Sequence, residues 1–143
     1  MPNETDLVKE RLLSGGFTCV VHKGGAEYTS VERGVAPLIS FLESGVNISG
    51  GTAADKTVGA GAAHLYILLG IRAIWANVIS AKALELLVAA GISVAYGECV
   101  PHIINRKGDG ICPIESAVTP AKTSPEAYTL IKSTLAALRV KEK

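Results

Sequence analysis

The sequence is poor in aromatic residues and carries almost no net charge. Aromatic side chains make up 5% of the 143 residues, whereas hydrophobic residues together make up 48%. The core must therefore be built mainly from Ala, Val, Ile and Leu in thin layers, as helices packed on a sheet require. A formal net charge of +1 provides no overall field that would attract nucleic acid or a membrane surface.

The sequence also lacks the spacings of a disulfide framework or a zinc site. Its three cysteines form no CxxC pair, and no two of its three histidines lie three or four positions apart. An odd number of cysteines without such pairs argues against disulfides and against a four-ligand zinc site. We therefore expect no metal and no cofactor.

Long apolar runs are missing as well. No run reaches the roughly 18 residues that span a bilayer, and the polar start MPNETDLVKE lacks the basic and apolar regions of a signal peptide. We expect a cytoplasmic protein with no membrane partner. A chain of this length is the size of one domain, so residues 1–143 are predicted to form a single domain.

Hydrophobic periodicity and turn residues predict helices separated by short strands. The expected strands span residues 17–22, 27–31, 72–78 and 92–96, and the last two are expected to be fully buried. The expected shorter helices span 3–13, 35–43, 81–90, 112–115 and 124 onward. A longer central helix is predicted from Thr52 to Gly70, because Thr52 and Asp55 have the spacing of a capping box and the following residues are almost all apolar.

This order of elements predicts the fold. The succession of helix, strand, helix and strand from Thr52 to Tyr96 implies right-handed crossovers and parallel strands. Lys23-Gly24-Gly25 suits a tight turn, so residues 17–31 are expected to add an antiparallel β-hairpin. The sequence therefore predicts an α/β protein, a three-layer α/β/α sandwich with a mixed central sheet and an N-terminal hairpin.

Three stretches, GGTAADKTVGAGAAHLYILLG, SAKALELLVAAGI and CPIESAV, resemble an uncharacterised family of small bacterial proteins in the zinc-less branch of the cytidine-deaminase-like superfamily. The resemblance implies that a ligand sits where helix starts meet strand ends. Working deaminases carry a His or Cys ligand, a catalytic Glu and a PCxxC pair. Ala54-Asp55-Lys56 and the residues after Ile79 contain none of these, so zinc-dependent deamination is not expected.

Asp55 and Lys56 are the first candidate site residues. A cation at the start of a helix opposes its dipole, and a residue that breaks a local rule marks a candidate site. Lys56 could bind an anion or act as an amine nucleophile if desolvated, and Gly50, Gly51 and Thr52 would offer further ligand contacts. The alternative is that both charged residues only stabilise the helix or pair in solvent. The stretch also departs from a phosphate-binding loop, because Asp55 replaces its second glycine.

Cys112 is the second candidate. It is predicted to precede a helix whose dipole would stabilise a thiolate, with Arg106 and Lys107 shortly before it. Glu115 opposes this by repelling a thiolate. The alternative is a small, partly buried residue that begins a helix, and Cys19 and Cys99 are expected to lie in the core.

The leading interpretation is a protein without zinc that binds a small anionic or nucleotide-like ligand at the start of the central helix, through Gly50, Gly51, Thr52, Asp55, Lys56, Cys112 and Glu115. A second interpretation is a group-transfer enzyme that uses Cys112 or Lys56, with Asp55 as a further catalytic candidate. A third is a non-catalytic interaction module or homodimer. Interspersed acids and bases without aromatic residues among them argue against a nucleic-acid surface.

Overall fold

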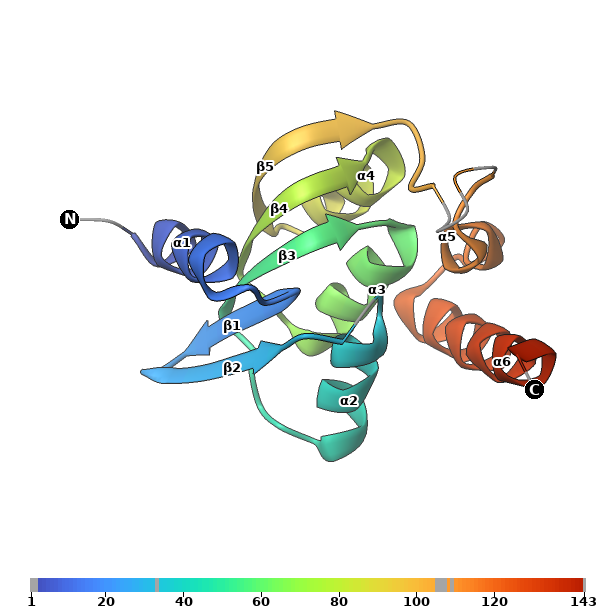
Figure 1. Ribbon diagram of the computed structural model, residues 1–143, viewed down its shortest axis with the longest axis horizontal. Coiled ribbons are helices and arrows are strands. Elements are labelled where there is room, and N and C mark those ends of the chain that lie inside the picture. The colour runs from blue at the N-terminus through green and yellow to red at the C-terminus, as the bar shows by residue number, and fades with distance from the viewer. Residues whose placement is uncertain (1–2, 33, 105–107, 109, 143) are drawn as a thin grey trace.

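The computed structural model describes residues 3–32, 34–104, 108 and 110–142. Helices and strands alternate along much of the chain (Figure 1). In chain order the elements are α1 (Glu4–Gly15), β1 (Cys19–Lys23), β2 (Ala26–Ser30), α2 (Ala36–Ser44), β3 (Thr52–Val58), α3 (Ala60–Leu69), β4 (Ala73–Ser80), α4 (Ala81–Ala89), β5 (Ser93–Val100), α5 (Pro113–Ala117) and α6 (Ser124–Glu142).

The five strands form one mixed sheet in the order β2-β1-β3-β4-β5. β3, β4 and β5 are parallel, because α3 and α4 connect them, whereas β1 is antiparallel to both of its neighbours. The expected hairpin is confirmed as β1 and β2. Short-range signals placed several helix ends correctly: Asn3 caps α1 through Asp6 N, and Ser80 caps α4 through Ala83 N.

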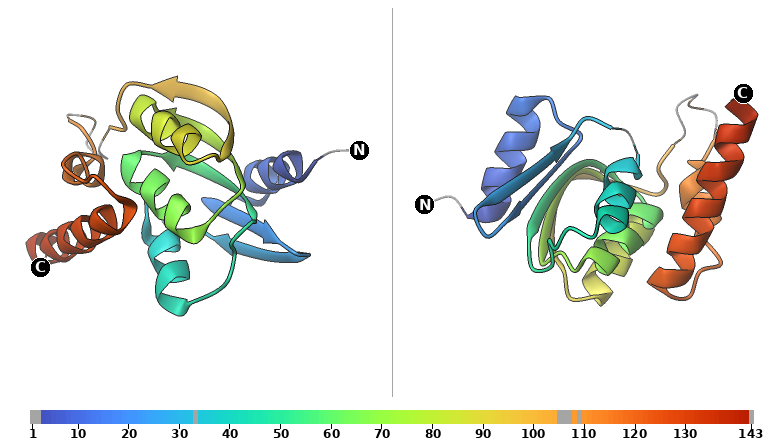
Figure 2. Two further views of the ribbon diagram at one scale, coloured as in Figure 1. Left: turned by 180° about the vertical axis from the view of Figure 1, so that it is seen from behind. Right: turned by 90° about the horizontal axis from the view of Figure 1, so that it is seen from below.

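Helices cover both faces of the sheet, which confirms the three-layer sandwich (Figure 2). α1 lies alone on one face, where a small apolar cluster packs around Leu12 and Trp75. The larger core lies on the other face, between the sheet and α2, α3 and α4. α6 packs against α3 and α5, and its Lys132 Nζ lies 2.9 Å from Glu43 Oε2 on α2.

The predicted start of the central helix was wrong. Residues Thr52–Val58 form β3, and helix α3 begins only at Ala60, after Gly59. β3 is the middle strand of the sheet and is covered on both faces, and its Ala53 and Ala54 are fully buried. Small side chains suit such a strand because helices approach it from both sides, whereas the Thr52–Asp55 spacing favoured a helix only locally.

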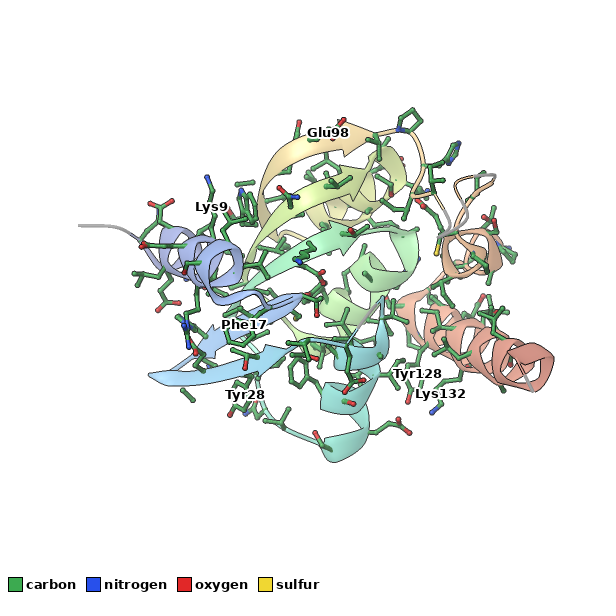
Figure 3. The ribbon with its side chains drawn as sticks, viewed as in Figure 1. Lys9, Phe17, Tyr28, Glu98, Tyr128 and Lys132 are labelled. Atoms are coloured by element: carbon green, nitrogen blue, oxygen red, sulfur yellow. The ribbon has the colours of Figure 1, made fainter. Side chains whose placement is uncertain are left out.

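The prediction of a fully buried last strand was also wrong. β5 lies at one edge of the sheet and is mostly exposed. Figure 3 shows Glu98 of β5 at the opposite edge from Tyr28 of β2. Cys99, expected in the core, is exposed, whereas Cys19 is buried as expected. None of the described helices combines the length and apolar character needed to cross a membrane.

Candidate functional site

A cavity of about 340 Å³ lies at the C-terminal end of β3, next to the start of α3 and to α5. Its polar lining comes mainly from Asp55, Lys56 and Thr57 on β3 and from Cys112 and Glu115 at α5. The carboxyl end of a parallel strand beside a helix start is the usual place for a ligand site in an open α/β sheet. The structure thus brings Asp55, Lys56, Cys112 and Glu115 together around one cavity.

Asp55 is buried and takes part in a chain of hydrogen bonds. The Tyr66 hydroxyl on α3 donates to Asp55 Oδ2 at 2.7 Å, and the Thr57 backbone N–H donates to Oδ1 at 3.2 Å. Burial raises the pKa of the Asp55 carboxyl to about 7, although the hydrogen bonds from Tyr66 and from the backbone oppose the shift. The group can therefore gain or lose a proton near neutral pH.

The chain of hydrogen bonds extends away from the cavity to Cys19 on β1, whose sulfur lies 3.3 Å from the Tyr66 hydroxyl oxygen. Because Tyr66 donates its proton to Asp55, the Cys19 thiol is left to donate to the Tyr66 oxygen. Burial and the nearby Asp55 charge raise the pKa of the Cys19 thiol, and burial raises the pKa of Tyr66 well above its usual value. Both groups stay protonated near neutral pH, so Asp55 is the member of this hydrogen-bonded series that titrates there.

Glu115 is a second buried carboxyl group, with only 7% of its surface exposed. Its Oε2 accepts the Ile103 backbone N–H at 2.6 Å. Its Oε1 is buried and has no hydrogen-bond partner among the residues that the structure describes. An unpaired buried carboxylate oxygen is costly, so it marks a place where a partner is missing.

Two glycines allow α5 to approach the start of α3 closely. A Cβ at Gly59 would lie 3.4 Å from Glu115 Oε2, and a Cβ at Gly61 would lie 2.5 Å from Ile114 Cγ2. The missing side chains let the Glu115 carboxylate lie beside the start of α3, where the helix dipole favours negative charge. Gly59 is the N-cap residue and α3 has no side-chain cap.

Cys112 and Lys56 differ from the two buried carboxyl groups. Cys112 is the N-cap residue of α5, as expected, but its side chain makes no capping hydrogen bond, and its thiol is partly buried. Lys56 is exposed, whereas the interpretation as an amine nucleophile required a buried side chain. Arg106 and Lys107, predicted to favour a Cys112 thiolate, lie outside the described residues.

The structure places Gly50, Gly51 and Thr52 away from the cavity. Gly50 N donates to Gly70 O at 2.7 Å, and the Thr52 hydroxyl donates to Glu4 Oε2 on α1 at 2.9 Å. Thr52 is the first residue of β3, whereas the cavity lies at the other end of that strand. The expected role of these three residues depended on a helix that starts at Thr52, and it is lost with that helix.

Sequence reasoning did not place Tyr66, Gly59 or Gly61 among the candidate site residues. Gly59 and Gly61 had a signal, because the β-branched pair Thr57-Val58 followed by glycine is typical of a strand that leads into a helix. Tyr66 had none, since its contact with Asp55 across α3 and β3 depends on tertiary packing.

His64, on helix α3, is buried in the core and lies within hydrogen-bond distance of a side chain of α6. It is 5% exposed, and its Nδ1 lies 3.1 Å from the Ser124 hydroxyl oxygen. Within the described part of the chain, no group of three or more His, Cys, Asp or Glu side chains is placed to hold a metal ion.

The arrangement can do two things chemically. Its carboxyl oxygens can accept hydrogen bonds from a ligand, and Asp55 can exchange a proton near neutral pH. The Cys112 thiol lines the same cavity and adds a potential nucleophile.

Comparison with solved structures reveals an extensive similarity. A DUF1893 family protein (TM1506) from Thermotoga maritima is 25% identical, with a TM-score of 0.83 over 96% of this chain and 91% of that chain. A diaminohydroxyphosphoribosylaminopyrimidine deaminase/5-amino-6-(5-phosphoribosylamino)uracil reductase from the same organism is 20% identical, with a TM-score of 0.43 over 55% of this chain and 28% of that chain. The second similarity is too weak to support an inference. No curated protein matches the chain.

The family assignment follows from the sequence as well as from the fold. The model of the TM1506 family, described as a domain of unknown function (DUF1893), matches residues 7–135. This range contains β1 to α5, and so every element that lines the cavity. The chain belongs to the TM1506 (DUF1893) family.

Proposed function

We propose that the protein binds a small, nucleotide-like molecule in the cavity between β3, α3 and α5. The observation that carries this proposal is that Glu115, in the wall of a cavity of about 340 Å³, has a buried oxygen without a partner among the described residues. A ligand pocket typically combines apolar walls with a few converging polar groups. Here the apolar part of the wall includes Val35, Ile103 and Ile114. The buried polar groups are Asp55 and Glu115.

The positions of the charges indicate how such a ligand would lie. Two buried carboxyl groups disfavour an anionic group deep in the cavity, because their acceptor oxygens offer it few hydrogen-bond donors and repel its charge whenever they are ionised. Lys56 is exposed and also lines the cavity. A phosphate or carboxylate of the ligand would therefore lie outward, near Lys56, with the neutral part of the molecule inside.

A thermal-shift screen tests this proposal with nucleosides, nucleotides and phosphorylated metabolites as probes. A probe at about 100 times its dissociation constant should add about 2.7 kcal/mol to the free energy of unfolding. The same probe should slow alkylation of Cys112, which lines the cavity, and should leave alkylation of the exposed Cys99 unchanged. Failure of the whole panel to stabilise the protein would contradict the proposal.

A second candidate function is a group-transfer reaction with Cys112 as nucleophile. It is favoured by the position of the thiol in the same cavity as Asp55, whose pKa of about 7 suits a general acid or base. Iodoacetamide should then alkylate Cys112 faster than the more exposed Cys99, and Asp55→Asn should slow this reaction. Slower labelling of Cys112 than of Cys99 in the wild-type protein would remove this candidate.

A further inference from the structure

The unpaired oxygen of Glu115 restricts the chemistry of the group that can occupy the inner cavity. A carboxylate oxygen accepts hydrogen bonds, so the partner that Oε1 lacks is a donor. Oε2 already accepts the Ile103 N–H at 2.6 Å, and Oε1 is buried without a partner among the described residues. A phosphate or carboxylate would place another acceptor beside it and leave the oxygen unpaired.

Capping of α3 does not satisfy this oxygen. The carboxylate lies beside Gly59, with Oε2 3.4 Å from the place that a Cβ would take. Yet α3 has no side-chain cap at its N-terminus, and Oε1 makes no hydrogen bond with a described residue. The helix dipole accounts for the position of the negative charge there, but a hydrogen-bond donor is still required.

Asp55 adds a second acceptor to the same cavity. Its Oδ2 accepts from Tyr66 and its Oδ1 from the Thr57 N–H, and each carboxylate oxygen can accept a further hydrogen bond. Asp55 and Glu115 are the two acids among the described residues that line the cavity. The only described base that lines the cavity is Lys56. Its ammonium group is exposed, so solvent screens its attraction for an anion.

We infer that the inner cavity recognises a compact group rich in N–H donors, namely an amidine, a guanidine or an amino-substituted heterocycle, with Glu115 as the main acceptor and Asp55 as the second. The inference rests on the proposed function, because it names the part of the ligand that lies inside the same cavity. Planar groups with two N–H donors match carboxylates well, since both bonds form in one geometry. Ile103 and Ile114 suit a small apolar body attached to such a group.

Two probes of nearly equal shape test this inference. Benzamidine carries N–H donors and a positive charge, whereas benzoate carries only acceptors and a negative charge. Calorimetric titration should detect binding of benzamidine to the wild-type protein and no binding of benzoate. Glu115→Gln replaces the carboxylate with a neutral amide and should weaken the binding of benzamidine by about tenfold or more. Glu43→Gln, on the exposed pair with Lys132, is the matched control and should leave the affinity unchanged.

Alkylation of Cys112 provides a second measurement in the wild-type protein, in case Glu115→Gln does not fold. Benzamidine should protect Cys112, and benzoate should not. If benzoate protects Cys112 as well as benzamidine does, or if Glu115→Gln leaves benzamidine binding unchanged, the inference is wrong while the proposed small-molecule site stands. If neither these probes nor the nucleotide panel binds, both proposals are wrong.

Discussion

Asp55 makes the stability of the protein depend on pH. Its pKa rises from 3.8 to about 7 on burial, so the folded protein holds a proton that the unfolded chain releases between these values. The stabilisation that protonated Asp55 contributes is complete below the pKa of the unfolded state and is lost as the pH rises through about 7. We expect the free energy of unfolding to fall by about 2 to 3 kcal/mol more between about pH 5 and about pH 8 in the wild type than in Asp55→Asn.

Urea denaturation at a series of pH values measures this difference. Asp6→Asn changes an exposed acid in the first turn of α1. As the control, it should retain the wild-type slope of unfolding free energy against pH. The comparison with Asp55→Asn also separates Asp55 from His64, whose pKa is lowered by burial and whose contribution changes with pH in the opposite direction. Equal slopes in the wild type and Asp55→Asn would show that the carboxyl titrates as in solution.

Substitution of Gly61 by alanine should change the stability of the protein in the direction opposite to that expected from helix propensity. Alanine favours a helix over glycine, by up to about 1 kcal/mol in a helix interior, and Gly61 lies in the first turn of α3. At this position a Cβ would lie 2.5 Å from Ile114 Cγ2, so Gly61→Ala should instead destabilise the protein by about 1 to 2 kcal/mol. Chemical denaturation of the single and double variants tests this, because Ile114→Ala removes the clashing methyl group. Additive effects of the two substitutions would contradict a clash between these side chains.

The elements differ in how far the sequence determines them. The hairpin, α1, α2 and α4 were predicted because their turns, caps and periodicity are local, as Ser80 at the start of α4 shows. β3 was missed because its Ala-Ala-Asp-Lys core has weak strand propensity, and pairing with β1 and β4 determines its conformation. β5 was taken as buried because apolar composition does not reveal which strand lies at an edge.

The same distinction applies to the candidate site. Asp55, Lys56 and Cys112 were chosen from helix-terminal arguments, and two of those arguments depended on a helix start in the wrong place. Asp55 and Lys56 still line the cavity because the C-terminal half of β3 lies next to the true start of α3. Neither the hydrogen bond from Tyr66 nor the lack of a partner for Glu115 Oε1 within the described part of the chain was predictable, since both depend on segments that only the fold brings together.

Helix α1 is held by a small apolar cluster of its own. Leu12 is 1% exposed and packs there with Trp75, whereas the adjacent Leu13 is 58% exposed. We expect Leu12→Ala to lower the free energy of unfolding by about 2 to 4 kcal/mol and Leu13→Ala to change it by less than about 0.5 kcal/mol. Differential scanning calorimetry of the two neighbouring variants measures the contrast. Equal effects would mean that α1 does not dock through Leu12.

The two apolar clusters share the sheet between them, with Val20 and Ala54 facing α1 and Val21 and Ala53 in the larger core. Strands common to both clusters should couple their unfolding, so residues 1–143 are expected to unfold as one domain. Far-UV circular dichroism and alkylation of the buried Cys19 should then report the same denaturation midpoint. Loss of helix signal before Cys19 becomes reactive would indicate that a helical part unfolds separately.

The sheet also separates the only tryptophan from the cavity. Trp75 is 6% exposed and packs in the cluster beneath α1, with Lys9 Nζ 5.2 Å from its ring centre. Its fluorescence is therefore suited to following detachment of α1. A ligand that enters the cavity beside α3 and α5 lies on the other side of the sheet, so it should hardly change the fluorescence emission of Trp75. A fluorescence screen would therefore overlook such ligands, and a label on Cys112 would be the more sensitive reporter.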